Sequence, residues 1–168
     1  MAESDDDPLH AAVRDLSAAD PGRRAAAAER LAHAGTLTGD AVVAVVRACG
    51  DDDDTVREWA VAALEDAGAP PETVIPDLAS LAAASQPLVA YWAITLLGRT
   101  GQAAATAVDA LAKCIASKDL AVAQRAAWAL GKIGPRAAAA VSALRDATAR
   151  GDERLTRLAE EAIAAIGA

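Results

Sequence analysis

The pattern of apolar and polar positions repeats along the chain with a period of 33 residues. Each copy ends on a glycine, preceded four residues earlier by Leu or Ile and eight residues earlier by Ala. Residues at i and i+4 lie on one face of a helix, so this pair predicts the buried face of a helix that ends near the glycine. The five glycines are Gly35, Gly68, Gly101, Gly134 and Gly167.

A second pair of apolar positions, earlier in each copy and three residues apart, predicts another helix. An Asp (Gln86 in the third copy) stands between the two helices, where it can cap the second one. The glycine is suited to a left-handed residue that ends it. We therefore predict two antiparallel helices per copy, over residues 8–17 and 21–34, 40–49 and 53–67, 73–83 and 87–100, 104–117 and 120–133, and 137–149 and 153–166.

One such hairpin cannot bury its apolar face alone, and stacking of neighbouring hairpins solves that problem. The predicted fold is all-α: an α-solenoid, a right-handed superhelix of five 33-residue hairpins forming a single domain over residues 8–168. Residues 1–7 are acidic and are expected to be a disordered tail.

Ankyrin repeats have the same period and are the main alternative. Residues 7–12 read DPLHAA, close to the ankyrin T-P-L-H-x-A signature, but the matching positions of the later copies lack its Pro and His. Tetratricopeptide repeats prefer 34 residues and carry a W-x₂-L-G-x₂-Y pattern that is absent from this sequence.

The units TVREWAVAALEDAG and VAQRAAWALGKIGPRAAAAVSAL resemble short HEAT-like repeats of the phycobilisome-lyase type, with a V-R-x-x-A-A-x-A-L-G-x-I-G second helix. The resemblance spans about residues 8–167. It implies an α-solenoid that acts as an interaction scaffold, and some members of the family are bilin lyases. No lyase residue can be carried over. The matching positions are Val56, Arg57, Ala60, Leu64 and Gly68, then Val122, Ala126, Leu130, Gly131, Ile133 and Gly134, followed by Val141, Ala143 and Leu144.

Composition narrows the possible partners. Hydrophobic residues make up 54% of the 168 residues but aromatics only 2%, so alanine-rich helices must approach closely. A net charge of -8 disfavours binding to nucleic acid and to anionic lipid, because both kinds of binding require clustered Lys and Arg side chains. The sequence shows no secretory signal and no apolar run long enough for a membrane span. We expect a cytoplasmic protein, and the preference for Arg and Ala fits a GC-rich bacterial genome.

Candidate catalytic and metal sites are scarce. His10 and His33 are the only histidines and lack nearby partner ligands; the expected role of His33 is at a helix C-terminus. GDDDDTVREW fails the EF-hand positions, and Asp53 fits a helix cap better. We expect Cys49 and Cys114 to be small buried core residues. We therefore expect no metal, no cofactor and no catalysis.

The second helices are expected to line the concave face of the solenoid, as the resemblance implies. Tyr91, Ile94 and Trp128 fall outside the inward columns and form a predicted apolar patch within a polar rim. An alternative is that Trp128 folds back over Gly131 or Ala127. Trp59 and Trp92 share one register and are expected mainly to pack between repeats. The predicted partner-binding residues are Arg57, Glu58, Val61, Tyr91, Ile94, Thr95, Gln124, Trp128 and Arg157.

These observations predict a non-catalytic scaffold or adaptor that binds a protein partner and is itself a monomer or weak homodimer. A bilin-lyase-like or lyase accessory protein is the alternative. A designed repeat protein is a third possibility, although the copies differ widely outside the structural columns.

Overall fold

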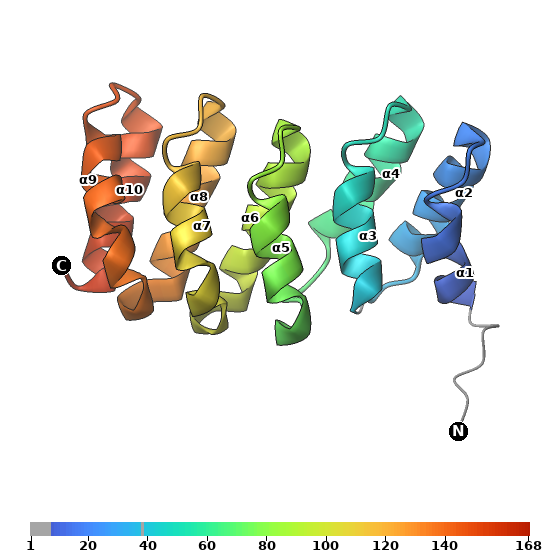
Figure 1. Ribbon diagram of the computed structural model, residues 1–168, viewed down its shortest axis with the longest axis horizontal. Coiled ribbons are helices and arrows are strands. Elements are labelled where there is room, and N and C mark those ends of the chain that lie inside the picture. The colour runs from blue at the N-terminus through green and yellow to red at the C-terminus, as the bar shows by residue number, and fades with distance from the viewer. Residues whose placement is uncertain (1–7, 38) are drawn as a thin grey trace. The chain divides into compact units, whose positions relative to one another are not determined.

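The computed structural model describes residues 8–37 and 39–168, and helices account for most of that part of the chain. The chain forms two compact units, residues 1–70 and 71–168. Figure 1 shows each unit as a series of helix pairs. The predicted acidic tail, residues 1–7, lies outside the described residues. That the two units make one domain stays a prediction.

The N-terminal unit contains two helix pairs. α1 (Pro8–Asp15) packs on α2 (Pro21–His33), and α3 (Asp40–Ala48) packs on α4 (Asp54–Glu65). α2 and α4 also lie side by side, so the second helices of these two repeats form one layer. This is the stacking that the repeated apolar columns predict.

The C-terminal unit contains three helix pairs. Its second helices, α6 (Pro87–Thr100), α8 (Leu120–Ile133) and α10 (Glu153–Ile166), pack side by side in one layer. Its first helices form the other layer and are drawn in front of it in Figure 1. They are α5 (Ile75–Leu81), α7 (Val108–Cys114) and α9 (Val141–Thr148).

A short 3₁₀ helix opens each repeat of this unit: η1 (Glu72–Val74), η2 (Gly101–Ala107) and η3 (Gly134–Ala140). First helices are therefore present within the predicted spans 73–83, 104–117 and 137–149, but each begins with a 3₁₀ segment and its α-helical part is shorter than predicted. Inside η2 and η3 the backbone leaves the helical region, at Ala104 and Ala137. The positive φ of 60° at Gly101 and 68° at Gly134 turns the chain at once, so a tight 3₁₀ segment replaces both the loop and the first α-helical turn.

The predicted aspartate caps are confirmed. The side chains of Asp20, Asp53, Asp119 and Asp152 each accept a hydrogen bond from the backbone N–H three residues on. The predicted cap at Gln86 is wrong, because its side chain makes no such bond. Pro87 opens α6 instead, with a backbone φ already suited to a helix.

The glycine column does not have one conformation. Gly167 adopts the predicted left-handed form after α10, with φ 85° and ψ 32°. Gly101 and Gly134 combine positive φ with extended ψ, and Gly68 has no positive φ. The left-handed prediction is thus wrong for these three positions, because the segment after the helix differs from repeat to repeat.

The predicted columns form the centre of the core. The alanine column is fully buried throughout, and its leucine neighbours are at most 1% exposed in the first four repeats. In the fifth repeat Ile166 is buried, whereas Ile163 of the predicted column is only half-buried. Small side chains let helices approach closely, which is how an alanine-rich chain excludes water. The alanines are Ala27, Ala60, Ala93, Ala126 and Ala159.

Candidate functional site

Tyr91 and Trp128 come together on the layer of second helices through a residue between them, Arg125. Its guanidinium carbon lies 4.5 Å from the centre of the Tyr91 ring and 4.9 Å from that of Trp128. Arg125 Nη2 also donates to the Tyr91 hydroxyl. All three side chains are half-buried. The guanidinium is attracted to the faces of both rings. Because the three side chains remain half-buried, this contact lies at the surface and not in the core.

The repeat explains this arrangement. α6 and α8 pack side by side, and Arg125 follows Tyr91 by one repeat and one residue. Trp128 lies three residues beyond Arg125 on the same face of α8. Arg125 is absent from the predicted partner-binding residues, because its register holds Trp59 and Trp92 in earlier repeats and is typical of packing. The aromatic residue one turn along its own helix is the sequence signal that could have identified it.

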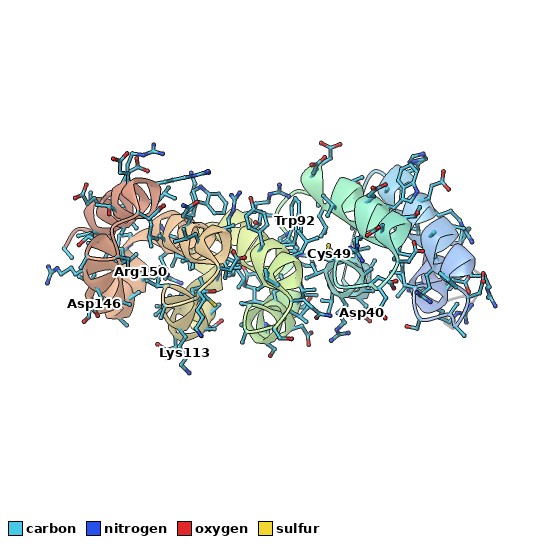
Figure 2. All side chains as sticks on the ribbon, turned by 90° about the horizontal axis from the view of Figure 1, so that it is seen from above. Asp40, Cys49, Trp92, Lys113, Asp146 and Arg150 are labelled. Atoms are coloured by element: carbon cyan, nitrogen blue, oxygen red, sulfur yellow. The ribbon has the colours of Figure 1, made fainter. Side chains whose placement is uncertain are left out.

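Further cations extend the arrangement along both helices. Lys132 Nζ lies 5.8 Å from the Trp128 ring centre, and the Arg99 guanidinium lies 5.8 Å from that of Trp92. Tyr91 and Trp92 meet edge to face, 5.8 Å apart. We call these six residues the aromatic–cation row: Arg99, Trp92, Tyr91, Arg125, Trp128 and Lys132. Figure 2 shows Trp92 on the α6 layer and Lys113 projecting from α7 on the opposite side.

Trp128 folds back over a glycine, but not over Gly131. A Cβ on Gly98 of α6 would lie 2.9 Å from Cε3 of the Trp128 ring, so the ring occupies space that only glycine leaves open. Gly131, one repeat later, instead admits the backbone of α10, where Ala162 Cα would lie 3.2 Å from an added Cβ. The structure therefore combines the two predictions for Trp128, a surface patch and a ring folded over a small residue. One side of the indole packs on Gly98, and another part of the ring is accessible at the surface.

Two predicted surface residues, Ile94 and Thr95, are buried, at 0% and 4% exposed. Their expected place on an open face is wrong. α6 is enclosed by α5, α8 and η2, and close packing of alanine-rich helices covers the registers beside the apolar columns as well. The Thr95 hydroxyl donates to the backbone carbonyl of Tyr91 at 2.8 Å, which satisfies it inside the helix layer.

Predicted rim residues make contacts within the protein. Gln124 Nε2 donates to Asp152 Oδ1 at 2.9 Å and so links α8 to the start of α10. The Leu155 backbone N–H and this amide together hold the pKa of Asp152 below its ordinary value. Arg157 forms an exposed pair with Glu161 at 3.7 Å. Gln124 therefore has a structural role.

The remaining predicted residues lie on α4 of the N-terminal unit. Arg57 Nη1 donates to the Asp51 carbonyl at 2.5 Å, and its guanidinium pairs with Asp54. Glu58 is exposed and Val61 half-buried. Arg57 therefore holds the start of its own helix rather than standing free.

The acidic run at the start of α4 has a structural explanation. Arg24 donates to both carboxylate oxygens of Asp51, from Nε and Nη2, each at 2.8 Å. This hydrogen bonding lowers the pKa of Asp51. The pair links the turn after α3 to α2, so Asp51 has a structural role. Across residues 8–37 and 39–168, no group of three or more His, Cys, Asp or Glu is arranged to hold a metal ion.

His33 and Trp59 join the two repeats of the N-terminal unit. Their rings meet edge to face with centres 5.4 Å apart, His33 from the last turn of α2 and Trp59 from α4. This confirms the predicted packing role of Trp59 and the position of His33 at a helix C-terminus.

Two hollows open on the C-terminal unit. A small pocket of about 180 Å³ lies beside the row, between α8 and α10. Trp128, Lys132, Leu158 and Glu161 line it together with small residues. It is wide enough for one apolar side chain.

The larger hollow, of about 750 Å³, lies where the turns of the third and fourth repeats meet. Ala90 and Ser117 border it. Some other repeats have an arginine in these two registers: Arg24 and Arg57 correspond to Ala90, and Arg150 corresponds to Ser117. Arg150 donates to the backbone carbonyls of Ile115 and Ser117 and so fills the next turn (Figure 2). The hollow is therefore a place where the arginine link is missing.

None of the helices in the described chain is long and apolar enough to cross a membrane. Cys49 and Cys114 are free and buried, as expected of core residues, and burial raises the pKa of the Cys49 thiol to about 12.

Known structures share this architecture. A crystal structure of an engineered protein from the Northeast Structural Genomics Consortium has a TM-score of 0.64 and 22% identity, over 95% of this chain and 79% of that one. A designed armadillo repeat protein in complex with peptide (KR)4 has a TM-score of 0.64 and 16% identity, over 92% and 80%. Another designed armadillo repeat protein has a TM-score of 0.63 and 18% identity, over 94% and 82%. At these identities the likeness shows the fold alone: a solenoid of helical repeats.

Curated proteins provide no match to this sequence. Residues 75–164 match the family of HEAT repeats, more than half of the chain. The ankyrin alternative is therefore not supported. The family match implies helix pairs of about 33 residues whose second helices pack side by side. The structure has this architecture. The chain belongs to the HEAT-repeat family.

Proposed function

We propose that this protein is a non-catalytic scaffold that binds a peptide segment of a protein partner on the α6 and α8 layer. The observation that carries the proposal is Arg125 held between the rings of Tyr91 and Trp128 on an accessible surface. Arg, Tyr and Trp are the side chains that most often dominate binding energy at interfaces. Because stacking already orients them, little side-chain entropy is lost when a partner binds.

The fold supports this function. Stacked helical repeats present long regular surfaces, and a designed armadillo repeat protein of similar fold is solved with a bound peptide. The small pocket beside Trp128 adds a place for an apolar side chain of the partner. The bilin-lyase-like alternative stays a prediction of the repeat pattern, because neither the fold nor the comparisons test it.

A phage library of random dodecapeptides tests the proposal. The library is selected on the wild type and on the Tyr91→Ala/Trp128→Ala variant, after circular dichroism shows equal helicity. We expect peptides that bind the wild type and not the variant. Leu120→Ala is the matched control, since Leu120 is 44% exposed on α8 and lies outside the row. Peptides that bind all three proteins equally would move the site elsewhere.

A second copy of the chain is the competing occupant of this surface. Light scattering after size exclusion, on the wild type and the same double variant, distinguishes the two. A dimer that the double substitution converts to a monomer would show that the row is a self-association surface.

A further inference from the structure

Charge is distributed unevenly along the chain. Residues 1–70 hold 15 of the 24 acidic and 6 of the 16 basic residues, a net charge of -9, and residues 71–168 hold the other 9 and 10, a net charge of +1. Within the C-terminal unit, α6 and α8 contain Arg99, Arg125 and Lys132 and no Asp or Glu. The neighbouring α10 carries three glutamates and two arginines. The two helices of the row are therefore a cationic surface on an acidic protein.

Arg125 and Lys132 have no carboxylate partner among the described residues. The side-chain hydrogen bond of Arg125 goes to the Tyr91 hydroxyl, and Lys132 contacts the Trp128 ring. A guanidinium has five N–H donors in one plane, and stacking on its faces leaves its edges accessible. Such an edge matches a carboxylate, which accepts two parallel hydrogen bonds.

Arg125 and Lys132 also lie on the two sides of Trp128 along α8. They are separated by seven residues, or about 10 Å along a helix. An extended peptide covers that distance in about three residues. The small pocket lined by Trp128, Lys132, Leu158 and Glu161 opens between α8 and α10, beside this stretch.

We propose that the α6 and α8 surface binds an acidic peptide segment, with a carboxylate on Arg125, a second near Lys132, and an apolar side chain between them in the pocket beside Trp128. This rests on the proposed function and specifies the chemistry of its partner. Nucleic acid fits less well, because its affinity comes from many phosphate contacts and the chain as a whole carries a charge of -8.

The peptides selected in the dodecapeptide experiment test this directly. We expect those that depend on Tyr91 and Trp128 to be enriched in Asp and Glu on both sides of an apolar residue. Selected peptides that depend on the row but are neutral or basic would keep the proposed function and overturn this inference. If no selected peptide depended on the aromatic–cation row, both the proposed function and this inference would be wrong.

Fluorescence anisotropy then measures one selected peptide with its carboxylates intact and with each changed to the amide. We expect the amide form to bind at least about tenfold more weakly, as does the intact peptide to Arg125→Gln. Arg125→Lys keeps the positive charge but cannot donate two parallel hydrogen bonds to one carboxylate. We expect its affinity for the acidic peptide to lie between those of the wild type and Arg125→Gln. Lys132→Gln is a second variant on the same helix face, and we expect it to weaken binding of the acid form only. Equal affinity for the acid and amide peptides would overturn the inference.

A labelled oligothymidylate is the probe for the competing anion. If it bound more tightly than the acidic peptide and lost binding in Arg125→Gln, the surface would be a nucleic-acid site and the proposal would be wrong. Weak binding of the oligothymidylate, unchanged in that variant, is the expected result.

Discussion

Trp128 of α8 packs against Gly98 of α6: a Cβ on that glycine would overlap Cζ3 of the indole ring and lie 2.9 Å from Cε3 and 3.0 Å from Cη2. The absence of a side chain at Gly98 thus determines where the Trp128 ring can lie. The held indole is in turn one of the two rings around Arg125. The geometry of the proposed surface therefore depends on a glycine that lies beneath the indole.

We expect Gly98→Ala to displace the Trp128 ring while leaving the fold intact. The obstructing atoms are the outer edge of a half-buried side chain, and alanine favours the helix by about 1 kcal/mol relative to glycine. Net stability should change by less than about 1 kcal/mol. The indole N–H resonance of Trp128 should shift in an NMR spectrum, and binding of selected peptides should weaken.

Gly131→Ala is the matched comparison. There the added methyl group meets the backbone of α10 at Ala162, which cannot rotate away. We expect a net loss of about 1 kcal/mol in the free energy of unfolding, since crowding outweighs the gain in helix propensity. A Gly131→Ala protein as stable as Gly98→Ala in urea would contradict this account of the two glycines.

Arg150→Ala should destabilise the C-terminal unit by about 1 kcal/mol. The guanidinium donates to the carbonyls of Ile115 and Ser117, and both carbonyls lose that partner in the variant. Urea unfolding measures the loss. Arg145→Ala, an exposed arginine on α9, is the control and should change stability little. Equal effects of the two substitutions would mean that the link between the turns contributes nothing.

Asp51 should make the N-terminal unit sensitive to acid. Its folded-state pKa lies below the ordinary 3.8 because Arg24 donates to the carboxylate. The resulting stabilisation is present above that ordinary value and disappears as pH falls through the lowered pKa. We expect Asp51→Asn to unfold at lower urea concentration at neutral pH, and the difference from wild type to shrink below about pH 4.

Trp59 is the only tryptophan of the N-terminal unit, so its fluorescence can follow this transition in a background with Phe at the other two tryptophan positions. Asp52→Asn, at the exposed neighbouring residue, is the control. A pH-independent difference between wild type and Asp51→Asn would show that the ion pair with Arg24 is not its source.

The two thiols should resist modification in the folded protein. Burial raises the pKa of Cys49 to about 12 and also raises that of Cys114, so little thiolate exists near neutral pH. Ellman's reagent should react slowly in buffer and fully in urea. Cys114 is 8% exposed and borders the larger hollow, so it should react before Cys49, at 1%. Single Cys→Ser variants assign the rates.

The periodic part of this protein could be predicted from the sequence. Columns of Ala and Leu at fixed positions in each 33-residue copy predict buried helix faces, and the structure buries nearly all of them. The Asp caps follow from local chemistry, since a cap needs only a side chain and the N–H three residues away. Residues 75–164, which match the HEAT-repeat family, contain these columns from the last three copies.

Which residues form the proposed binding surface, by contrast, could be determined only from the tertiary structure. Ile94 and Thr95 lie in registers that a helical wheel places outside, yet neighbouring helices cover them. Arg125 shares a register with two packing tryptophans, and only the side-by-side packing of α6 and α8 brings it between Tyr91 and Trp128. A repeat pattern determines which side chains must avoid water, because burial acts column by column. How close two alanine-rich helices approach, and what fits between them, depends on residues from both at once.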